Sequence, residues 1–431
     1  MIIATELDWI APEAAFLALG APGVAFLDSS AAGDARARIS YLCLAPAAAL
    51  ALDDAPYTTL RSWMAAHRPA ALPDWPFPFK GGAVGWLGYD AARAATGVAS
   101  RFAAMPGMPG GWFGLYTTLL GFDLAARRLH YLGPAGRLAA ITAQLAAPLA
   151  PPPLPPLAWR AEMDRGDYLA RHERLRAYIA AGDVYQANFT LRFRSPRPPQ
   201  ATLPALHMAL RALSPAPFAA CIDAGGYGLV SASPERFLRL GADGRVETRP
   251  IKGTAARHAE PVADAAAARA LAASPKERAE NLMITDLLRH DLGQVCAIGS
   301  VAVPELFAVE SFAQAHHLVS AVTGQLRKGL DAFDLLAATL PGGSITGAPK
   351  RRAMQIIDAL EQGPRGAYCG ALAWIGFDGA MDSAIIIRTI TATADTLYAQ
   401  AGGGITWDSS APAEYEEAML KISPLLALGH G

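Results

Sequence analysis

The sequence has few cysteines and no segment typical of export. Four cysteines among 431 residues lie far apart and form no C-x-x-C pair. Such thiols are typical of reduced, mostly buried side chains in a cytosolic protein, and they argue against disulfides or zinc ligands. The first residues lack the basic start and the apolar run of a signal peptide. We therefore expect a cytoplasmic protein.

The chain also lacks an excess of either charge and a run that could span a membrane. It has 37 Lys and Arg against 38 Asp and Glu, a formal net charge of -1, and no run of five like charges. This balance gives no indication of a nucleic acid or a membrane surface as partner. The longest uncharged segment, residues 138–159, contains polar side chains and several prolines. These residues exclude a membrane-spanning helix there.

A proline-rich segment, residues 148–156, is the clearest internal boundary. Strand-like runs broken by glycine and proline precede it, and apolar strands mixed with amphipathic helices follow it. The alternation is not a regular βαβ pattern, which disfavours a simple doubly wound sheet. The pattern alone predicts a mixed α and β protein.

Lys252 stands in the segment Arg249-Pro250-Ile251-Lys252-Gly253-Thr254. The backbone is restricted by proline before the lysine and permissive at the glycine after it. This arrangement suits an amine that must be aimed at a target. A surface lysine after a turn is the alternative that these six residues leave open.

Glutamates on two predicted helices form a candidate magnesium site. Glu280 lies on a helix predicted over residues 276–292, and Glu417 lies on one predicted over residues 412–422 together with Glu414 and Lys421. The buried face of the first helix is predicted to consist of Ala279, Leu282, Met283, Leu287 and Leu288. Mg²⁺ prefers one or two carboxylates with waters and substrate oxygens. The alternative is solvated helix faces, with Glu417 and Lys421 as an ordinary i,i+4 pair.

Two glycine-rich segments and one arginine are candidate contacts for an anion. Residues 342–350 are predicted to form a turn that leads into a helix, and amides at a helix N-terminus favour anions. The segment Gly402-Gly403-Gly404 exposes backbone N–H groups, unless it forms a bulge or a hairpin turn. Arg388 falls within an apolar, strand-like run, where burial is costly without a partner such as a carboxylate.

Together these segments resemble the chorismate-utilising enzymes. The stretch around Lys252 reads Pro-Ile-Lys-Gly-Thr, where the anthranilate-forming members usually have Pro-Ile-Ala-Gly-Thr. A lysine in the third place resembles the branch that makes 4-amino-4-deoxychorismate. Similar segments extend from residues 81–85 to Lys421 and are densest after Gly182.

The resemblance implies an α+β fold with two antiparallel β-sheets packed as a sandwich and helices outside. It also implies three parts of the chain. Residues 1–147 would form an N-terminal subdomain packed into the catalytic fold, 148–156 a connector, and 157–431 the chorismate-binding catalytic domain.

Roles for individual residues follow from the same resemblance. Lys252 would be a covalent nucleophile, Glu235 an acid–base group, and Glu280 and Glu417 the Mg²⁺ ligands. His317 would lie near the substrate ring, although a buried histidine is more often structural. The implied substrate contacts are Gly253, Thr254, Thr346, Tyr368, Arg388, Gly402, Gly403, Gly404 and Lys421.

The activity implied is conversion of chorismate and ammonia to 4-amino-4-deoxychorismate, for p-aminobenzoate and folate synthesis. Anthranilate or aminodeoxyisochorismate synthesis is the nearest rival, and Lys252 is the residue that distinguishes them. An isochorismate or salicylate synthase is disfavoured for the same reason. A catalytically silent subunit that only activates a glutaminase would not need Glu235, Lys252, Glu280, Arg388 and Glu417 together.

Two partners other than chorismate are considered. None of the cysteines lies on the G-x-C-x-G turn of a glutaminase nucleophile, so ammonia is expected from a separate glutamine amidotransferase subunit. Residues 26–30 and 214–218 resemble the two segments that hold tryptophan in this family. Asp28 replaces the glutamate usual in the regulated members, so we do not expect feedback control.

Overall fold

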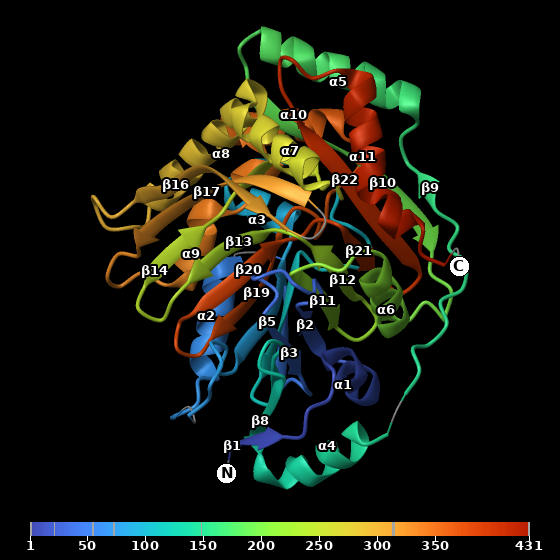
Figure 1. Ribbon diagram of the computed structural model, residues 1–431, viewed down its shortest axis with the longest axis vertical. Coiled ribbons are helices and arrows are strands. Elements are labelled where there is room, and N and C mark those ends of the chain that lie inside the picture. The colour runs from blue at the N-terminus through green and yellow to red at the C-terminus, as the bar shows by residue number, and fades with distance from the viewer. Residues whose placement is uncertain are drawn as a thin grey trace.

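The computed structural model describes residues 2–20, 22–53, 56–71, 74–147, 149–312 and 315–429, so Pro148 of the connector lies outside the described residues. Within these ranges the chain forms one sheet of twelve strands and one of ten, both antiparallel, together with eleven α-helices. In Figure 1 the sheets occupy the middle of the molecule and the helices lie outside them. The expected α+β sandwich is confirmed.

The twelve-stranded sheet mixes strands from both ends of the sequence. Its order is β1(Ile2–Leu7), β8(Arg128–Pro134), β7(Leu119–Asp123), β3(Ile39–Cys43), β2(Ala25–Asp28), β11(Phe218–Asp223), β12(Gly228–Ser233), β21(Thr389–Ala392), β22(Thr396–Ile405), β10(Gln186–Pro196) and β18(Gly347–Ala348), with β9(Arg160–Ala161) on β10. The N-terminal strands thus continue the C-terminal ones across the β2–β11 pair.

The ten-stranded sheet also mixes strands from the two ends of the sequence. Its order is β15(Ile251–Ala256), β17(Ala315–Gln325), β14(Arg245–Thr248), β13(Arg236–Leu240), β20(Met381–Ile385), β19(Ala371–Gly376), β5(Gly82–Leu87), β6(Gly111–Tyr116) and β4(Ala48–Leu52), with β16(Ala302–Ser311) on β17. Residues 149–159 between the two parts of the chain form no helix or strand. The domain limits inferred from the sequence stay a prediction.

A core of apolar side chains lies between the sheets, and further cores lie under the outer helices. The inner cluster joins Val84, Trp86 and Leu372 of one sheet to Ile222 and Leu229 of the other. Two such apolar faces bury each other in an aligned sandwich. Burial of all four cysteines, none of them in a disulfide, agrees with the expectation of free thiols.

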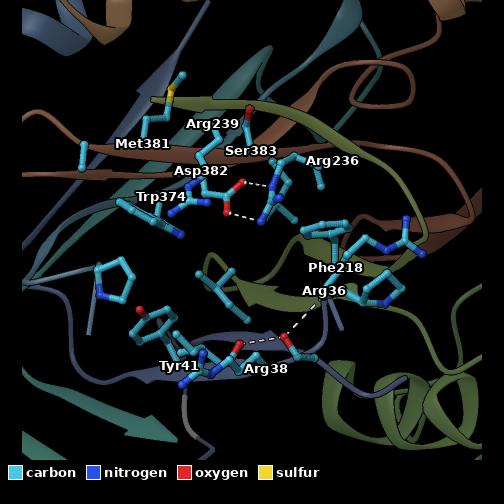
Figure 2. A pocket seen from close by; sticks show the side chains of 18 of the residues that line it. Arg36, Arg38, Tyr41, Phe218, Arg236, Arg239, Trp374, Met381, Asp382 and Ser383 are labelled. Carbon is cyan, nitrogen blue, oxygen red and sulfur yellow. Dashed lines mark hydrogen bonds and ion pairs between the residues drawn. The ribbon is translucent and has the colours of Figure 1, made fainter. Parts of the chain in front are cut away.

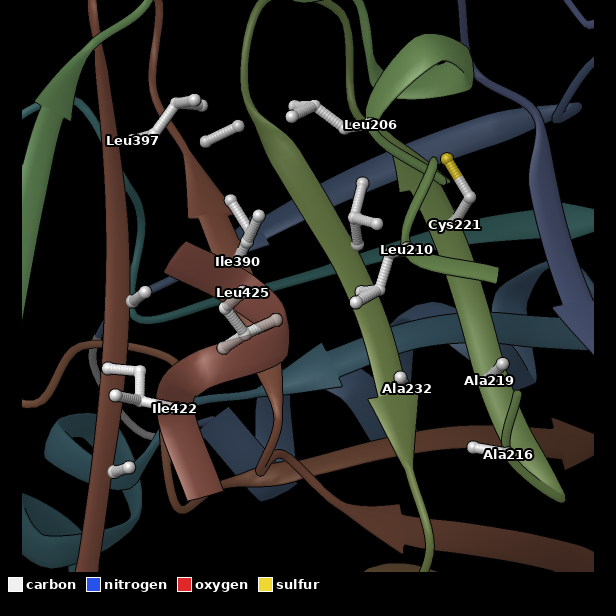
Figure 3. Close-up of a cluster of buried hydrophobic side chains, with 14 of the residues drawn as sticks. Leu206, Leu210, Ala216, Ala219, Cys221, Ala232, Ile390, Leu397, Ile422 and Leu425 are labelled. Carbon is white, nitrogen blue, oxygen red and sulfur yellow. The ribbon is translucent and has the colours of Figure 1, made fainter. Parts of the chain in front are cut away.

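The helices cover the outer faces of the sheets. They are α1(Pro12–Leu19), α2(Pro56–Ala66), α3(Tyr89–Ala95), α4(Leu138–Leu145), α5(Arg165–Ala180), α6(Leu203–Leu213), α7(Pro261–Ala273), α8(Pro275–Gly293), α9(Ala332–Thr339), α10(Lys350–Leu360) and α11(Ala411–Leu426). Figure 1 shows α5, α7, α8, α10 and α11 gathered at one end of the molecule. In Figure 3, Ile422 and Leu425 of α11 and Leu206 and Leu210 of α6 pack on the strands of the twelve-stranded sheet. Across the described ranges, no helix combines the length and the apolar character needed to cross a bilayer.

Helix α8 forms where the sequence predicted it, but its buried face is different. Ser274 caps the helix by accepting a hydrogen bond from the Glu277 amide, and Pro275 occupies the first turn. The buried positions are Asn281, Ile284, Thr285, Leu288, Asp291 and Leu292. Leu282 is 50% exposed, so the face predicted from Ala279, Leu282 and Met283 is wrong. Hydrophobic spacing could not predict this face, because two of its members are polar. Asn281 is buried with a hydrogen bond to the neighbouring strand, and Thr285 is buried with a hydrogen bond to Asn281.

Candidate active site

Lys252 lies on β15, the edge strand of the ten-stranded sheet, directly above α8. The register of β15 against β17 shifts between Ile251 and Thr254, which is the irregularity of a bulge. Gly253 has φ +91°, and a Cβ there would lie 2.9 Å from Oε2 of Glu277 on α8. The glycine therefore permits both the turn of the strand and its close approach to the helix. This local geometry fixes the position of the lysine side chain.

The amine of Lys252 is surrounded by charges of both signs. Burial lowers the pKa of Lys252, while the carboxylates of Glu280, Glu235 and Glu417 oppose this and the Lys421 ammonium adds to it. Because desolvation disfavours the ammonium form, the neutral amine is more populated than in a free lysine. Glu280 comes from α8, Glu417 and Lys421 come from α11, and Glu235 comes from the β12–β13 turn. The structure thus brings five of the predicted residues together, these four and Lys252.

Glu235 is held between strands by its backbone. Its carbonyl oxygen accepts a 3.2 Å hydrogen bond from the Ile385 amide. Burial raises the pKa of Glu235 to about 7, against the lowering effects of the Lys252 charge, the Ile251 amide, Arg36 and Lys421. A carboxyl group with this pKa is present in both protonation states near neutral pH, as a general acid or base requires.

Three glutamates gather where α8 and α11 approach each other. Glu280 lies 3.9 Å from the Lys276 amine, and Glu417 lies 2.6 Å from the Lys421 amine. Glu414, which the sequence analysis placed on the same helix side without a role, is buried and accepts a 2.8 Å hydrogen bond from Ser409. Burial raises the pKa of Glu280 and of Glu414, and the charge of Glu414 contributes to the shift at Glu280.

The donor chemistry of this cluster fits Mg²⁺. The described residues contain no group of three or more His, Cys, Asp or Glu side chains arranged to hold a metal ion by themselves. Mg²⁺ usually takes one or two carboxylates and completes its shell with water and substrate oxygens. Glu280 and Glu417 supply that number of hard oxygen donors from two helices, and lysines neutralise them in the structure.

The three glycines of the C-terminal segment lie inside β22, in register with β10, so the hairpin-turn alternative is excluded. Each glycine allows a close approach. A Cβ would lie 2.1 Å from the Phe189 carbonyl at Gly402, 2.9 Å from Oε2 of Glu414 at Gly403, and 2.3 Å from Nε2 of Gln186 at Gly404. The Lys421 amine donates a 3.2 Å hydrogen bond to the Gly402 carbonyl. Gly403 thus lets the charged side chains of α11 approach the strand, while Gly402 and Gly404 permit close contact with β10.

Arg388 does not belong to a strand, contrary to the sequence prediction. β20 ends at Ile385 and β21 begins at Thr389, and Arg388 lies between them with φ +49°. The residue as a whole is exposed, but its guanidinium is desolvated enough for burial to lower the pKa of Arg388, in agreement with the expected cost of burying it. Among the described residues no hydrogen bond or ion pair engages its side chain, although its charge acts on Glu235. A free guanidinium in this position can bind a carboxylate.

The loop before α10 leads into a helix as predicted, and α10 begins at Lys350. Before the helix, Gly347 and Ala348 pair as β18 with Gln186 and Ala187, which the sequence did not predict. Thr346 is buried, and its hydroxyl donates a 2.7 Å hydrogen bond to the Gly342 carbonyl. Tyr368 is also buried, and its side chain lies against Cys369.

His317 and its neighbour have different surroundings. Nδ1 of His317 lies 3.0 Å from the hydroxyl of Thr254 across the β15–β17 pair. Burial, with the charges of Arg36 and Arg388, lowers the pKa of His317 to about 4, so its ring is neutral. His316 is buried between Ser311 (2.7 Å) and Asp264 (3.0 Å), which is a structural arrangement.

Sequence reasoning missed Arg36, which reaches this site from the β2–β3 loop. Its guanidinium donates to the Pro234 carbonyl, next to Glu235, and lies 3.9 Å above the Phe312 ring. No motif links Arg36 to these distant residues. Glu414 was placed on the same helix side as Glu417 but given no role, although its i,i+3 spacing from Glu417 was a usable signal.

A cavity of about 750 Å³ lies between the two sheets, and its lining includes Arg36 but not Lys252, Glu235, Glu280 or Glu417. The segments expected to hold tryptophan meet at its edge, where the Ser30 amide donates a 3.0 Å hydrogen bond to the Ala216 carbonyl. In Figure 2 Arg236 faces Asp382, with which it forms two hydrogen bonds, and Trp374 and Tyr41 line another side. Asp28 lines the cavity and binds Arg211 at 2.9 Å.

Comparisons with known proteins identify the class to which this fold and site belong. The family model described as chorismate binding enzyme matches residues 25–427. The chain therefore belongs to the chorismate binding enzymes.

Individual relatives narrow the resemblance. The chain is 46% identical to aminodeoxychorismate synthase component 1 of Klebsiella aerogenes over 81% of this chain and 77% of that protein. It is 42% identical to the protein of the same name from Salmonella typhimurium, covering 91% and 86%. Anthranilate synthase component I of Streptococcus pneumoniae superposes with a TM-score of 0.80 at 30% identity, covering 90% and 91%.

Proposed function

We propose that this enzyme converts chorismate and ammonia to 4-amino-4-deoxychorismate, the precursor of p-aminobenzoate for folate synthesis. The observation that carries the proposal is the position of Lys252, whose amine faces the carboxylates of Glu235, Glu280 and Glu417. An anthranilate-forming site has no need of an amine there. The names of the relatives at 46% and 42% identity support the same reaction.

The proposed reaction has two substitutions. Nζ of Lys252 attacks C2 of chorismate, the ring double bonds shift, and the C4–O bond breaks. Glu235, with a pKa of about 7, gives its proton to the departing oxygen, which leaves as water. Ammonia then attacks C4, the double bonds shift back, and the C2–N bond breaks with its electron pair returning to the lysine. The nitrogen of the product thus lies at C4.

The other predicted residues would bind and orient chorismate. Chorismate has two carboxylates, and the Arg388 guanidinium has no partner among the described residues. Glu280 and Glu417 would hold Mg²⁺, which supplies charge stabilisation for the ring carboxylate and the departing oxygen. The neutral ring of His317 beside Thr254 would contact the substrate without adding charge. A separate glutamine amidotransferase subunit would supply ammonia.

Product identification tests the proposal. The purified chain would be incubated with chorismate, Mg²⁺ and an ammonium salt, and the products separated by chromatography. We expect 4-amino-4-deoxychorismate and no anthranilate. Anthranilate as the main product would support the rival assignment, and isochorismate would refute an amination.

Tryptophan is proposed as an occupant of the cavity between the sheets, without feedback control. Asp28 lines this cavity and its carboxylate already binds Arg211, and Trp374 and Tyr41 offer aromatic faces to a ligand. Calorimetric titration with tryptophan tests occupancy. Strong inhibition of turnover by tryptophan would contradict the absence of feedback control.

A further inference from the structure

Arg36 joins three segments that are far apart in the sequence. Its guanidinium forms two hydrogen bonds with Asp34, at 3.0 Å and 2.7 Å, which fix its orientation. It donates a 3.3 Å hydrogen bond to the carbonyl of Pro234, and its other contact is the face of Phe312 at 3.9 Å. Its side chain is 19% exposed. A guanidinium that is paired, stacked and hydrogen-bonded in this way is held in one position.

Each of the two outward contacts of Arg36 leads to a candidate catalytic group. Pro234 immediately precedes Glu235 in the chain. The ring of Phe312 lies 5.6 Å from the ring of His317. The loop of Arg36 belongs to the twelve-stranded sheet, whereas His317 belongs to the ten-stranded one. The guanidinium therefore connects the two sheets at the point where Glu235 and His317 meet the site.

We propose that Arg36 is a positioning residue for the amination, and that it sets the placement of Glu235 and His317 by holding Pro234 and Phe312. This inference rests on the proposed function. The charge of Arg36 also lowers the pKa of both groups, which gives the geometric role a measurable consequence. Sub-ångström errors in the placement of reacting groups reduce rates strongly.

Other groups act on the same two side chains and would remain in an Arg36 variant. Those that act on Glu235 are Lys252, Lys421, Arg388 and the Ile251 amide. Those that act on His317 are Arg388, Asp34, His316 and the Thr254 hydroxyl. Removal of Arg36 alone removes one positive charge, so the pKa of Glu235 and that of His317 are both expected to rise.

The experiment compares Arg36→Gln and Arg36→Lys with the unmodified enzyme. We expect Arg36→Gln to lower kcat about tenfold or more while KM changes by less than about threefold, and to move the Glu235-dependent limb of the pH–rate profile to higher pH. Arg36→Lys keeps the charge but loses the planar fork, so it should restore the pH profile more fully than kcat. Arg128→Gln breaks an exposed bidentate pair with Glu6 on the same sheet and should leave all values unchanged.

A second readout does not depend on turnover. Histidine-selective NMR titration, assigned with a His317→Asn variant, should show a higher pKa for His317 in Arg36→Gln. If the unmodified enzyme makes no 4-amino product, the proposed function fails, and this titration still tests whether Arg36 acts on His317. A folded Arg36→Gln enzyme with unchanged kcat, pH profile and His317 titration would overturn the inference. If Arg36→Gln does not fold, Phe312→Leu removes the stacking contact and keeps the Arg36 charge, so it should lower kcat without moving the pH profile. An unchanged kcat in Phe312→Leu would then overturn the inference.

Discussion

The environment of Lys252 combines burial with charges of both signs, and the balance decides whether its amine can act as a nucleophile. A free lysine has a pKa near 10.4, so well under about 1% of its molecules carry a neutral amine at pH 7. Burial and the nearby Lys421 ammonium lower the pKa of Lys252 and raise that fraction. Three carboxylates act in the opposite direction, and any cation bound to them would remove much of that opposition.

Lys252→Ala should therefore abolish the 4-amino product. The substitution removes the nucleophile and restores the Pro-Ile-Ala-Gly-Thr sequence of the anthranilate-forming enzymes, so some ammonia attack at C2 is the expected residual reaction. Without ammonia, the unmodified enzyme should form a chorismate-derived adduct on Lys252 that intact-protein mass spectrometry detects. Lys276→Ala is the control, because it removes a lysine charge near Glu280 without touching β15. If Lys252→Ala forms the 4-amino product at an unchanged rate and no adduct is detected on the unmodified enzyme, Lys252 is not a nucleophile and contributes only its charge to the pocket.

Glu417→Gln should lower turnover by about a hundredfold or more, the scale of removing one strong electrostatic contact from a reacting centre. Glutamine keeps the shape of the side chain and removes the charge that faces Lys421 at 2.6 Å. Activity would be measured against Mg²⁺ concentration, with circular dichroism to check folding. Glu416→Gln on the same helix is the matched control, because Glu416 lies at an exposed position 3.7 Å from Arg165. A normal rate and normal Mg²⁺ dependence in Glu417→Gln would favour a solvated helix face.

The residues that could be predicted from the sequence are those on short local motifs. Lys252, Glu235 and Glu417 each stand in a short stretch that resembles a family segment, and the resemblance supplied their roles. Arg36 could not be predicted, because its contacts with Pro234 and Phe312 exist only after the two sheets pack. Arg388 was found but wrongly placed on a strand, because apolar periodicity cannot show the positive φ between β20 and β21.

At the scale of elements, α11 packs on β22 at the base of the site, and Gly403 leaves room for its Glu414 and Lys421 side chains. Apolar spacing predicted α11 over residues 412–422, and the helix extends from Ala411 to Leu426. The depth of its approach to β22 could not be predicted, since it depends on side-chain space above Gly403 that only the packed structure defines. The same is true of α8, whose buried face includes polar groups that pair across the helix–strand contact.

Gly402→Ala and Gly403→Ala should separate stability from activity on neighbouring positions of β22. A methyl group at Gly403 would lie 2.9 Å from Oε2 of Glu414 and 3.8 Å from the Lys421 amine, which are ends of flexible side chains. We expect Gly403→Ala to fold with a loss of about 1–3 kcal/mol, as for overpacking, and to lose most of its activity. At Gly402 the methyl group would meet the Phe189 carbonyl at 2.1 Å, so Gly402→Ala should lose more stability. Urea unfolding measures the stability of each variant, and kcat measures its activity. An equal loss of stability in the two variants would contradict the predicted difference between Gly402 and Gly403.

At the scale of the whole molecule, strands from the N-terminal third complete both sheets. β2 pairs with β11 in one sheet and β5 pairs with β19 in the other, so the sandwich requires residues from both sides of the proline-rich segment. Strand content could be predicted from local sequence, but these pairings could not, because they join segments nearly 200 residues or more apart. The resemblance to a family supplied the topology that periodicity lacked.

The proposed use of ammonia rests on all four cysteines of the chain. The four cysteines are buried, and burial raises the pKa of each thiol, so none is a reactive thiolate for glutamine hydrolysis. We therefore expect ammonium salts to support turnover by this chain alone and glutamine to support it only after a glutamine amidotransferase subunit is added. Product formation would be followed with each nitrogen source, with and without such a subunit. A Cys296→Ser variant, which changes the least enclosed of the four thiols, should behave like the unmodified enzyme. Efficient use of glutamine by the purified chain would refute the requirement for a partner.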